Sequence, residues 1–364
     1  MSHLFTSESV SEGHPDKVCD LIADSILDAY LAQDPNSQVA CEVLCKNAQV
    51  VLAGEIQSRA NVNHASVARK AIRRIGYSDP DEKFNAEGVR IRDFLECLPE
   101  NFRDEVDHRD SRLRSADQGL VFGFATTETP ELLPLPITLA HQITRTLAHH
   151  RHTGTVSFLR PDAKSQVTVR YEGANPVEVV DVVVSTQHAK STRQSEVKSY
   201  VRETLLPQAL GTWFNPSARL WVNPSGPFDV GGPEGDCGVT GRKIVVDTYG
   251  GAAPHGGGAF SGKDATKVDR SAAYFARYVA RKIVQRRLAQ IVEIQVAYAI
   301  GVSEPISIRV DTKGTGDNAA AAQYAARFDF RPGSIIRDLN LDQPIYTQTT
   351  NYGHFGKPSL EWEK

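Results

Sequence analysis

Residues 38–57 read QVACEVLCKNAQVVLAGEIQ, two apolar runs of similar length on either side of a short polar turn. The runs at 38–46 and 49–57 are dominated by apolar residues and bounded by polar ones, which predicts two strands joined as a hairpin. A helix with one apolar face is predicted before the hairpin at 17–33, and a basic helix after it at 63–76. The unit is therefore helix, two strands, helix.

The same pattern of predicted elements recurs twice further along the chain. Because it recurs at roughly 120–130 residues, too long for a solenoid repeat, it predicts three similar domains. Hairpin sheets with helices packed on one face define an α+β architecture. The second unit comprises a helix at 137–150, strands at 165–172 and 177–187, and a helix at 195–206. The third comprises a helix at 269–290, strands at 291–302 and 305–312, and a helix at 317–328.

Motif positions along the chain divide it into an N-terminal domain at 1–98, a central domain at 115–229 and a C-terminal domain at 230–364. Residues 99–114 are heavily charged and lack periodicity, which is typical of a linker or a mobile loop. These boundaries allow a strand from the sequence range of one domain to pair in the sheet of another.

Composition excludes several function classes. The 364 residues are 40% hydrophobic and 23% charged, as in ordinary globular proteins. A net charge of −3 argues against a nucleic-acid partner or a polybasic membrane surface. We expect no transmembrane helix, because no apolar run approaches the ~18 residues needed, and no signal peptide. The five cysteines are odd in number and lack a Cys-x-x-Cys spacing, which favours reduced thiols in the cytoplasm.

The strongest chemical signal lies at 250–270, which reads GGAAPHGGGAFSGKDATKVDR. Eleven of the 27 glycines fall within 231–262, where they let the backbone approach a ligand closely. Lys263 and Lys267 add positive charge, and Asp269 can hold a hard cation such as magnesium through oxygen. Together they predict a site for a polyphosphate carried with its metal.

Two other interpretations apply to this segment. The spacing from Gly257 to Gly262 and Lys263 nearly matches a P-loop, but Asp264 stands where that motif needs Ser or Thr. The preceding strand, predicted at about 242–249, is also separated from the motif by a long Gly/Pro stretch, so a P-loop is not favoured. A glycine-rich surface loop with solvated charges remains open at this point.

A second candidate site precedes the first predicted helix. The free N–H groups and the dipole at the start of a helix attract anions. This helix begins with His14, Asp16 and Lys17. His14 can donate to a departing oxygen, Asp16 can bind a metal, and Lys17 can pair with phosphate. The alternative is an ordinary capped helix with Asp16 as the cap.

Three further places carry candidate residues. Asp162 and Lys164 alternate along an extended segment, so both can face one ligand, although a solvated turn is the alternative. A second glycine loop at 232–243 combines an acid with a basic pair. Glu42 and Glu55 lie within otherwise apolar strands, where a carboxylate is rarely buried without a partner or a metal.

Taken together and in this order, the motifs resemble those of the S-adenosylmethionine synthetase family, also called methionine adenosyltransferases. The resemblance covers nearly the whole chain. It is carried by residues 4–17 (LFTSESVSEGHPDK), 117–126 (DQGLVFGFAT), 160–166 (RPDAKSQ), 231–251, 255–274 and 352–356 (YGHFG).

The resemblance implies that the sulfur of methionine attacks C5′ of ATP and displaces the triphosphate, which is hydrolysed to pyrophosphate and phosphate. It implies two Mg²⁺ ions per site and K⁺. It also implies three similar α+β domains with pseudo-threefold symmetry, and sites between the subunits of a homodimer or a dimer of dimers.

The same resemblance assigns roles to individual residues. The catalytic groups would be His14, Lys164, Lys243 and Lys263. ATP would be bound by His14, Asp162, Lys164, Phe228, Asp236, Arg242, Lys243, Ala259 and Lys263. Methionine would be bound by Glu55, Asp117, Asp236 and Lys267. Mg²⁺ would be bound by Asp16 and Asp269, and K⁺ by Glu42.

Two departures from the family pattern stand out. Pro227 replaces the Arg that usually precedes the adenine-stacking residue, here Phe228. The lid loop at 98–112 begins with Leu98 and Pro99 where the family has Gln. Leu98 cannot make an amide's hydrogen bonds, which predicts an altered lid and an altered turnover or thioether preference.

Two other function classes compete with an active adenosyltransferase. One is a hydrolase of triphosphate or ATP, and the retained Glu55 and Asp236 argue against it. The other is a catalytically weak subunit that regulates a partner. A complete set of retained charged groups argues against that reading: His14, Asp16, Lys164, Lys243, Lys263, Lys267 and Asp269.

Overall fold

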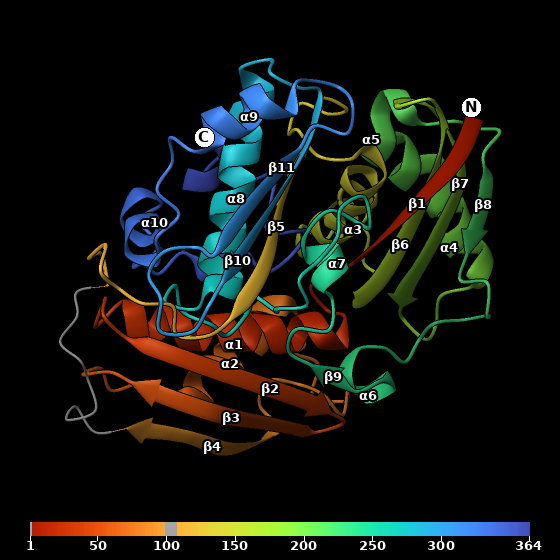
Figure 1. Cartoon of the computed structure of the whole chain (residues 1–364). Coiled ribbons are helices and arrows are strands. Elements are labelled where there is room, and N and C mark those ends of the chain that lie inside the picture. Colours follow the sequence, from red (N-terminus) through yellow and green to blue (C-terminus); the bar gives the residue numbers. More distant parts are fainter. Residues whose placement is uncertain (1, 99–107) are drawn as a thin grey trace.

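The computed structural model describes residues 2–98 and 108–364 and contains three sheets, each with helices packed on it (Figure 1). Part of the predicted loop, 99–107, lies outside the described residues. The three-domain α+β prediction is confirmed. Among the described residues, no helix combines the length and the apolar character needed to cross a bilayer.

The N-terminal sheet has the strand order β4-β3-β2-β9. Alternation sets its two faces: Val39, Cys41 and Val43 point inward and are buried against the helices, while Glu42 and Leu44 lie on the open face. Figure 1 shows α1 and α2 on one side of this sheet only. Its elements are α1 (Pro15–Leu31), β2 (Gln38–Lys46), β3 (Gln49–Gln57), α2 (His64–Ile75), β4 (Arg90–Leu98) and β9 (Gly238–Val239).

The predicted helix–hairpin–helix unit at 17–76 is thus observed, with one addition. After α2 the chain returns as β4, which pairs parallel to β3. A helix that joins two parallel strands in this way forms a βαβ crossover. The segment was not predicted as a strand, because the charged residues Arg90, Arg92, Asp93 and Glu96 break up its apolar pattern.

The central sheet has the order β1-β6-β7-β8, with the helical segments on one face. The predicted helix at 195–206 is wrong in detail, because it is interrupted by a π-helix, η2, at Val201–Leu205. The elements are β1 (Ser2–Val10), α3 (Leu135–His152), β6 (Leu159–Glu172), β7 (Asn175–His188), α4 (Gln194–Tyr200), η2, α5 (Leu206–Leu210), η3 (Gly211–Trp213) and β8 (Arg219–Val222).

The C-terminal sheet has the order β11-β10-β5, and the long helix α8 packs on it. Gly123 on β5 touches the backbone of Ala276 on α8, so a side chain at 123 would hold the helix away from the sheet. The elements are β5 (Gly119–Thr126), α8 (Val268–Gln285), β10 (Ile291–Tyr298), β11 (Ser307–Asp311), α9 (Asn318–Ala325), α10 (Pro332–Asp338), η4 (Tyr346–Gln348) and η5 (Glu361–Glu363).

Each sheet includes a strand from a distant part of the chain. β1 pairs with β6, β5 pairs with β10, and β9 pairs with β2. In Figure 1 the red strand β1 lies beside the green strands of the central sheet. The sheets therefore do not coincide with the sequence ranges 1–98, 115–229 and 230–364, which stay a prediction as domain boundaries.

The chain before the glycine-rich segment differs from expectation. The strand predicted at about 242–249 is wrong: residues Ile244–Asp247 form a single helical turn, α7. A short helix, α6, lies upstream at Gly232–Gly235. The glycine-rich segment therefore does not follow a strand, which removes the remaining likeness to a P-loop.

A buried network of charges lies where α1, α7 and α8 meet. Arg270 on α8 pairs with Asp24 on α1 at 2.7 Å, and both side chains are fully buried. Lys17 pairs with Asp20 at 3.0 Å and with Asp247 at 2.7 Å. The prediction that Lys17 pairs with phosphate is therefore wrong, because its ammonium is buried and bound to two carboxylates.

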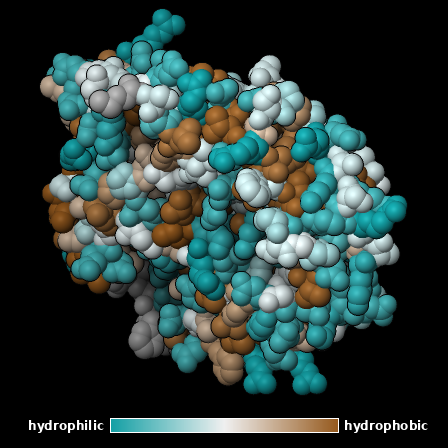
Figure 2. All heavy atoms as spheres, turned by 90° about the vertical axis from the view of Figure 1, so that its right-hand side faces the viewer, coloured by the Kyte–Doolittle hydropathy of each residue, from teal (hydrophilic) through white to brown (hydrophobic). Residues whose placement is uncertain are grey.

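The side of the molecule that carries β7, β8 and α4 shows hydrophobic side chains scattered among hydrophilic ones (Figure 2). Trp221 on β8 and Val177 on β7 are among the exposed apolar residues of this sheet. Scattered apolar side chains of this kind are normal on a protein surface.

Candidate active site

One group of predicted site residues surrounds the start of α1, and we call it the His14 group: His14, Asp16, Arg242 and Lys243. His14 caps the helix, because its Nδ1 accepts a hydrogen bond from the Asp16 N–H at 3.2 Å. The alternative with Asp16 as the cap is therefore wrong. The Asp16 carboxylate accepts from the Lys243 ammonium at 2.6 Å, and Arg242 lies at 3.7 Å.

The protonation of this group follows from its surroundings. Burial, reinforced by the nearby charge of Lys243, lowers the pKa of His14 to about 3, so its imidazole is neutral at physiological pH. Because Nδ1 accepts a hydrogen bond, we assign the proton to Nε2, which leaves a neutral N–H donor. Burial opposes ionisation of Asp16, but hydrogen bonds from Lys243 and Val239 lower its pKa overall, so it is a carboxylate.

The loop 231–239 lies against the His14 group. Asp162 is buried and accepts a hydrogen bond from the Gly232 N–H at 2.8 Å, and burial raises its pKa to about 6. Lys164 and Asp236 are exposed, and both act electrostatically on the pKa of His14. These residues, which are far apart in sequence, therefore lie around one place.

Phe228 is fixed through its backbone. Its N–H donates to Nε2 of His188 at 3.1 Å, and its carbonyl accepts from the His188 N–H at 2.9 Å. The side chain of Phe228 is half-buried, and Pro227 beside it is exposed. Sequence motifs gave no signal for His188, although it holds the segment that carries Phe228.

The second group lies at the start of α8, and we call it the Lys263 group: Lys263, Asp264, Lys267 and Asp269. The Lys263 ammonium donates to Asp269 at 2.7 Å, and Lys267 donates to Asp264 at 2.5 Å. Asp264 is buried and also accepts from the Val39 N–H at 2.6 Å. Lys263, Lys267 and Asp269 remain partly open to solvent.

The glycine at 258 is required by the Lys263 group. A Cβ atom at Gly258 would lie 2.2 Å from Cγ of Asp269, so any side chain there would displace this carboxylate. A cleft of about 510 Å³ opens beside Asp269 and is lined also by Gln118 and Gly256. Asp117 is exposed at this edge, and its carboxylate accepts from the Gln118 N–H at 2.7 Å.

Strand β2 joins the two glycine loops. Thr240 donates its N–H to the Val43 carbonyl at 3.0 Å, and Cys41 donates to the Gly262 carbonyl at 2.9 Å, both along the edge away from β3. The loops also touch directly, because a Cβ at Gly241 would lie 2.4 Å from Cβ of Ala259.

Glu42 lies on the open face of β2, between these two attachments. Desolvation by the surrounding residues raises its pKa, while the Thr240 hydroxyl and the Lys263 ammonium act in the opposite direction. Glu55 lies on the same face of β3, because its partner across the sheet is Ala40, which itself bridges to Lys263. Thr240 was not predicted from the sequence, since a lone hydroxyl in a glycine loop carries no distinctive pattern.

The chain does not bring the two groups into direct contact. Within residues 2–98 and 108–364, no hydrogen bond or ion pair links the His14 group to the Lys263 group. The same part of the chain contains no cluster of three or more His, Cys, Asp and Glu side chains that could hold a metal. Each group thus holds a carboxylate paired with a lysine: the buried Asp16 with Lys243, and the partly exposed Asp269 with Lys263.

Comparison with known protein families matches the chain in three consecutive segments. Residues 2–97 match the model described as "S-adenosylmethionine synthetase, N-terminal domain". Residues 112–228 match the central domain of the same family, and residues 230–364 match its C-terminal domain.

Curated relatives agree with this match along the full chain. An S-adenosylmethionine synthase of Helicobacter hepaticus is 49% identical over 369 residues, covering 100% of this chain and 96% of the relative. One of Deinococcus radiodurans is 48% identical and covers 99% of this chain and 95% of the relative. One of Deinococcus deserti is 47% identical, with 100% and 97% covered.

Proposed function

The chain belongs to the S-adenosylmethionine synthetase family, and we propose that its His14 and Lys263 groups together form the site where ATP and methionine react. The enzyme is a methionine adenosyltransferase, which transfers the adenosyl group of ATP to the sulfur of methionine and gives S-adenosylmethionine. The observation that carries the site assignment is the buried, neutral His14 beside Lys243 and Asp16.

The chemistry needs charge stabilisation more than proton removal. A lone pair on sulfur forms the new S–C5′ bond, and the C5′–O bond breaks with its electron pair going to the triphosphate. The neutral thioether has no proton to lose, so no general base is required. Rate acceleration must come from alignment and from donors aimed at the oxygen that becomes negative.

We assign His14 to that oxygen. Its Nε2–H is a donor that stays neutral, so it can stabilise developing charge without giving up a proton to solvent. Lys164, Lys243 and Lys263 would hold the triphosphate, with Arg242 and Ala259 alongside. Asp162, Phe228 and Asp236 would complete the ATP site, and Glu55, Asp117 and Lys267 would hold methionine together with Asp236.

The family uses a divalent metal, and the carboxylates of Asp16 and Asp269 fit such an ion. Mg²⁺ is typically held by one or two carboxylates together with substrate phosphates, rather than by a cage of protein ligands. Asp16 and Asp269 each offer one carboxylate beside a lysine, which suits such an ion and not a closed cage. We assign two Mg²⁺ per site to these residues, where the metal would neutralise charge on the leaving group.

A monovalent ion is assigned to Glu42. A carboxylate in an apolar strand whose pKa is raised by desolvation gains from a nearby cation. K⁺ near Glu42 would hold the segments at Thr240 and Lys263 at a fixed spacing along β2, because both attach to that strand.

We propose a homodimer or a dimer of dimers in which the His14 group of one subunit faces the Lys263 group of its partner. Two observations support it: the groups are separate within one chain, and the open face of the N-terminal sheet exposes Leu44, Phe94 and Leu98. We assign the enzyme to the cytoplasm on the basis of its five free cysteines. Hydrolysis of the displaced triphosphate to pyrophosphate and phosphate is proposed for the same site.

The function is tested by incubating the purified chain with ATP, methyl-labelled methionine, Mg²⁺ and K⁺. We expect a labelled sulfonium product by mass spectrometry, with phosphate and pyrophosphate formed in equal amounts. Reactions without methionine serve as the control. Phosphate release without any sulfonium product would instead identify a triphosphate or ATP hydrolase.

A further inference from the structure

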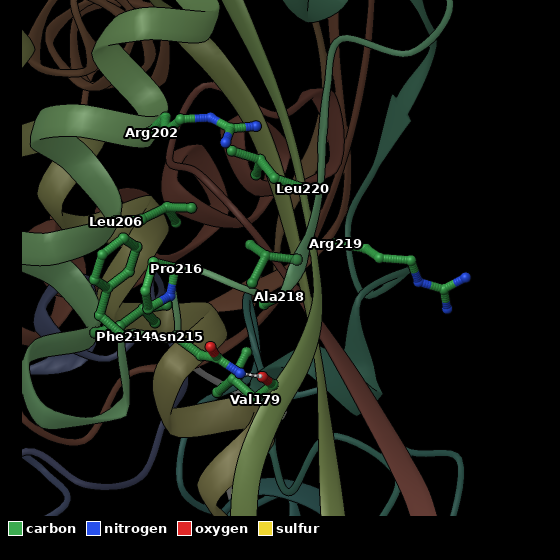
Figure 3. A pocket seen from close by; sticks show the side chains of 11 residues that line it. Val179, Arg202, Leu206, Phe214, Asn215, Pro216, Ala218, Arg219 and Leu220 are labelled. Carbon is green, nitrogen blue, oxygen red and sulfur yellow. Dashed lines mark hydrogen bonds between the residues drawn. The ribbon is translucent and has the colours of Figure 1, made fainter.

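A small cavity opens in the central domain, and none of the residues assigned to the active site line it (Figure 3). It encloses about 80 Å³ between the strands β7 and β8 and the helical segment η2–α5. This is several times the ~10–15 Å³ that one water molecule requires on a comparable measure. Its apolar wall is formed by Val179, Val182, Leu206, Leu210, Phe214 and Leu220.

Almost all polar side chains that line this cavity already have hydrogen-bond or ion-pair partners. Asn215 donates its amide to the Val179 carbonyl at 3.0 Å and accepts from the Ser217 N–H at 3.0 Å. Arg219 pairs with Asp181 at 2.7 Å, and Figure 3 shows it pointing away from the cavity. The lining contains no Asp or Glu.

Arg202 is the exception. It has no ion pair or hydrogen bond among the described residues. Figure 3 shows its guanidinium beside Leu220 at one end of the cavity. The site therefore combines an apolar chamber with one uncompensated positive charge, which is complementary to an anion with an apolar body.

The backbone around Arg202 is unusual as well. Arg202 lies in the π-helix η2, in which the Leu206 N–H donates to the Val201 carbonyl five residues earlier. Single π turns inside α-helices are rare and occur frequently at functional sites. Here the widened turn buries Val201 and Leu205 while leaving Arg202 exposed.

We propose that this cavity binds a small apolar monocarboxylate, with its ring or branched chain among Leu206, Phe214 and Leu220 and its carboxylate on Arg202. No carboxylate lines the cavity to pair with the ammonium group of a free amino acid, so the lining favours a monocarboxylate without an amino group over a second methionine. A nucleotide is too large for about 80 Å³.

Phenylacetate is the probe, titrated into the full-length protein by calorimetry without ATP or methionine. We expect a dissociation constant of about 1 mM or tighter, within the range open to a small ligand. Arg202→Gln should weaken phenylacetate roughly tenfold or more through loss of a charge-assisted hydrogen bond. The neutral analogue phenylethanol should bind both proteins equally. Arg219→Gln is the matched control and should leave both ligands unaffected.

A second pair of variants tests the chamber itself. Leu206→Trp should fill it and abolish binding of both probes, while S-adenosylmethionine formation and the melting temperature stay near wild type. If Leu206→Trp fails to fold, Ala218→Leu is the substitute. The proposal is overturned if phenylacetate shows no saturable heat up to about 10 mM, if Arg202→Gln and Arg219→Gln behave alike, or if ATP or methionine displaces the probe.

Discussion

Two ion pairs in this protein each join a basic side chain to an aspartate, but they differ in burial. In the buried network, Arg270 and Asp24 are fully buried and bind each other and neighbouring groups. In the Lys263 group, Lys263 and Asp269 form an equally short pair but stay partly exposed.

The difference lies in what each pair can still bind. The Arg270 guanidinium commits its five N–H donors to Asp24, Thr349, Tyr274 and the Lys263 carbonyl, so nothing remains for a ligand. A partly exposed lysine can exchange a carboxylate for a phosphate at little cost, because solvent screens both states. In these two pairs, the buried charges hold the fold, while the partly exposed charges stay free to bind a substrate.

Breaking the buried pair should have the largest effect, and it should be on stability. Arg270→Met leaves Asp24 buried without its partner, which typically costs about 3–5 kcal/mol. We expect a loss of that order in the free energy of unfolding, measured in urea, together with some loss of activity, because Arg270 also donates to the Lys263 carbonyl. An unchanged unfolding midpoint would mean that the pair does not hold α1 to α8.

Breaking the partly exposed pair of Lys263 and Asp269 should lower the rate of catalysis without lowering stability. Lys263→Ala and Asp269→Asn should each lower the rate of S-adenosylmethionine formation by about 10²–10³-fold, the usual cost of one preorganised contact to developing charge. Their melting temperatures should match wild type. Near-normal turnover with matching melts would remove the triphosphate from this group.

The buried network should also respond to acid. Burial, together with the charges of Lys17 and Arg270, lowers the pKa of His354 well below its usual value, and its Nδ1 shares a hydrogen bond with the Tyr274 hydroxyl. His354 is therefore neutral when folded and gains a proton when unfolded below about pH 6.5. Stability is complete above that pH and is lost as the pH falls, at up to about 1.4 kcal/mol per unit for one proton.

His354→Gln should flatten this slope between pH 6.5 and 4, measured by urea unfolding at each pH. His141 is shifted in the same direction by burial, so part of the slope should remain in the variant. If wild type and variant lost stability in parallel, His354 would not be a source of the acid sensitivity.

Potassium tests a third kind of charge, the Glu42 carboxylate, which is exposed on the open face of β2 but has a pKa raised by partial desolvation. We expect K⁺ to raise activity severalfold over Na⁺ or choline, and Glu42→Gln to remove the difference. Equal activity in all three salts would make Glu42 a structural residue.

The smallest effect should come from the altered lid. Leu98 offers methionine an apolar contact and no polar one, and an apolar pocket discriminates one methylene by only about 1–3 kcal/mol. We expect slower methionine turnover and wider tolerance of ethionine than in a chimera that carries a Gln-led loop. The kcat/KM values for both thioethers in both proteins decide this, and identical ratios would make the departure neutral.

Helices and strands could be predicted from the sequence more reliably than the burial of individual side chains. The helices at α1, α2, α3 and α8 and the hairpins followed from local periodicity, which is present in a single segment. Lys17 was misassigned because a lysine beside a motif looks the same whether it is buried or exposed. Its partner Asp247 is 230 residues away.

The candidate site residues could also be selected from local signals, but their arrangement in space could not. Glycine-rich loops and charged helix starts are local signals, so His14, Asp16, Lys263 and Asp269 could be selected. Their division into two separate groups depends on the edge of β2, to which Thr240 and Gly262 attach. That attachment is a long-range pairing, and no local pattern encodes it.

The exchanged strands impose an order on synthesis. Ser2 pairs with Glu172, so strand β1 has no partner until some 170 further residues have been made. At typical elongation rates this is a wait of roughly 10–30 s. Cys45 likewise meets Gly238 only late in translation, which leaves an edge of the first sheet open meanwhile. The nascent chain therefore carries unpaired strand edges until the partners that lie far along the sequence have been made.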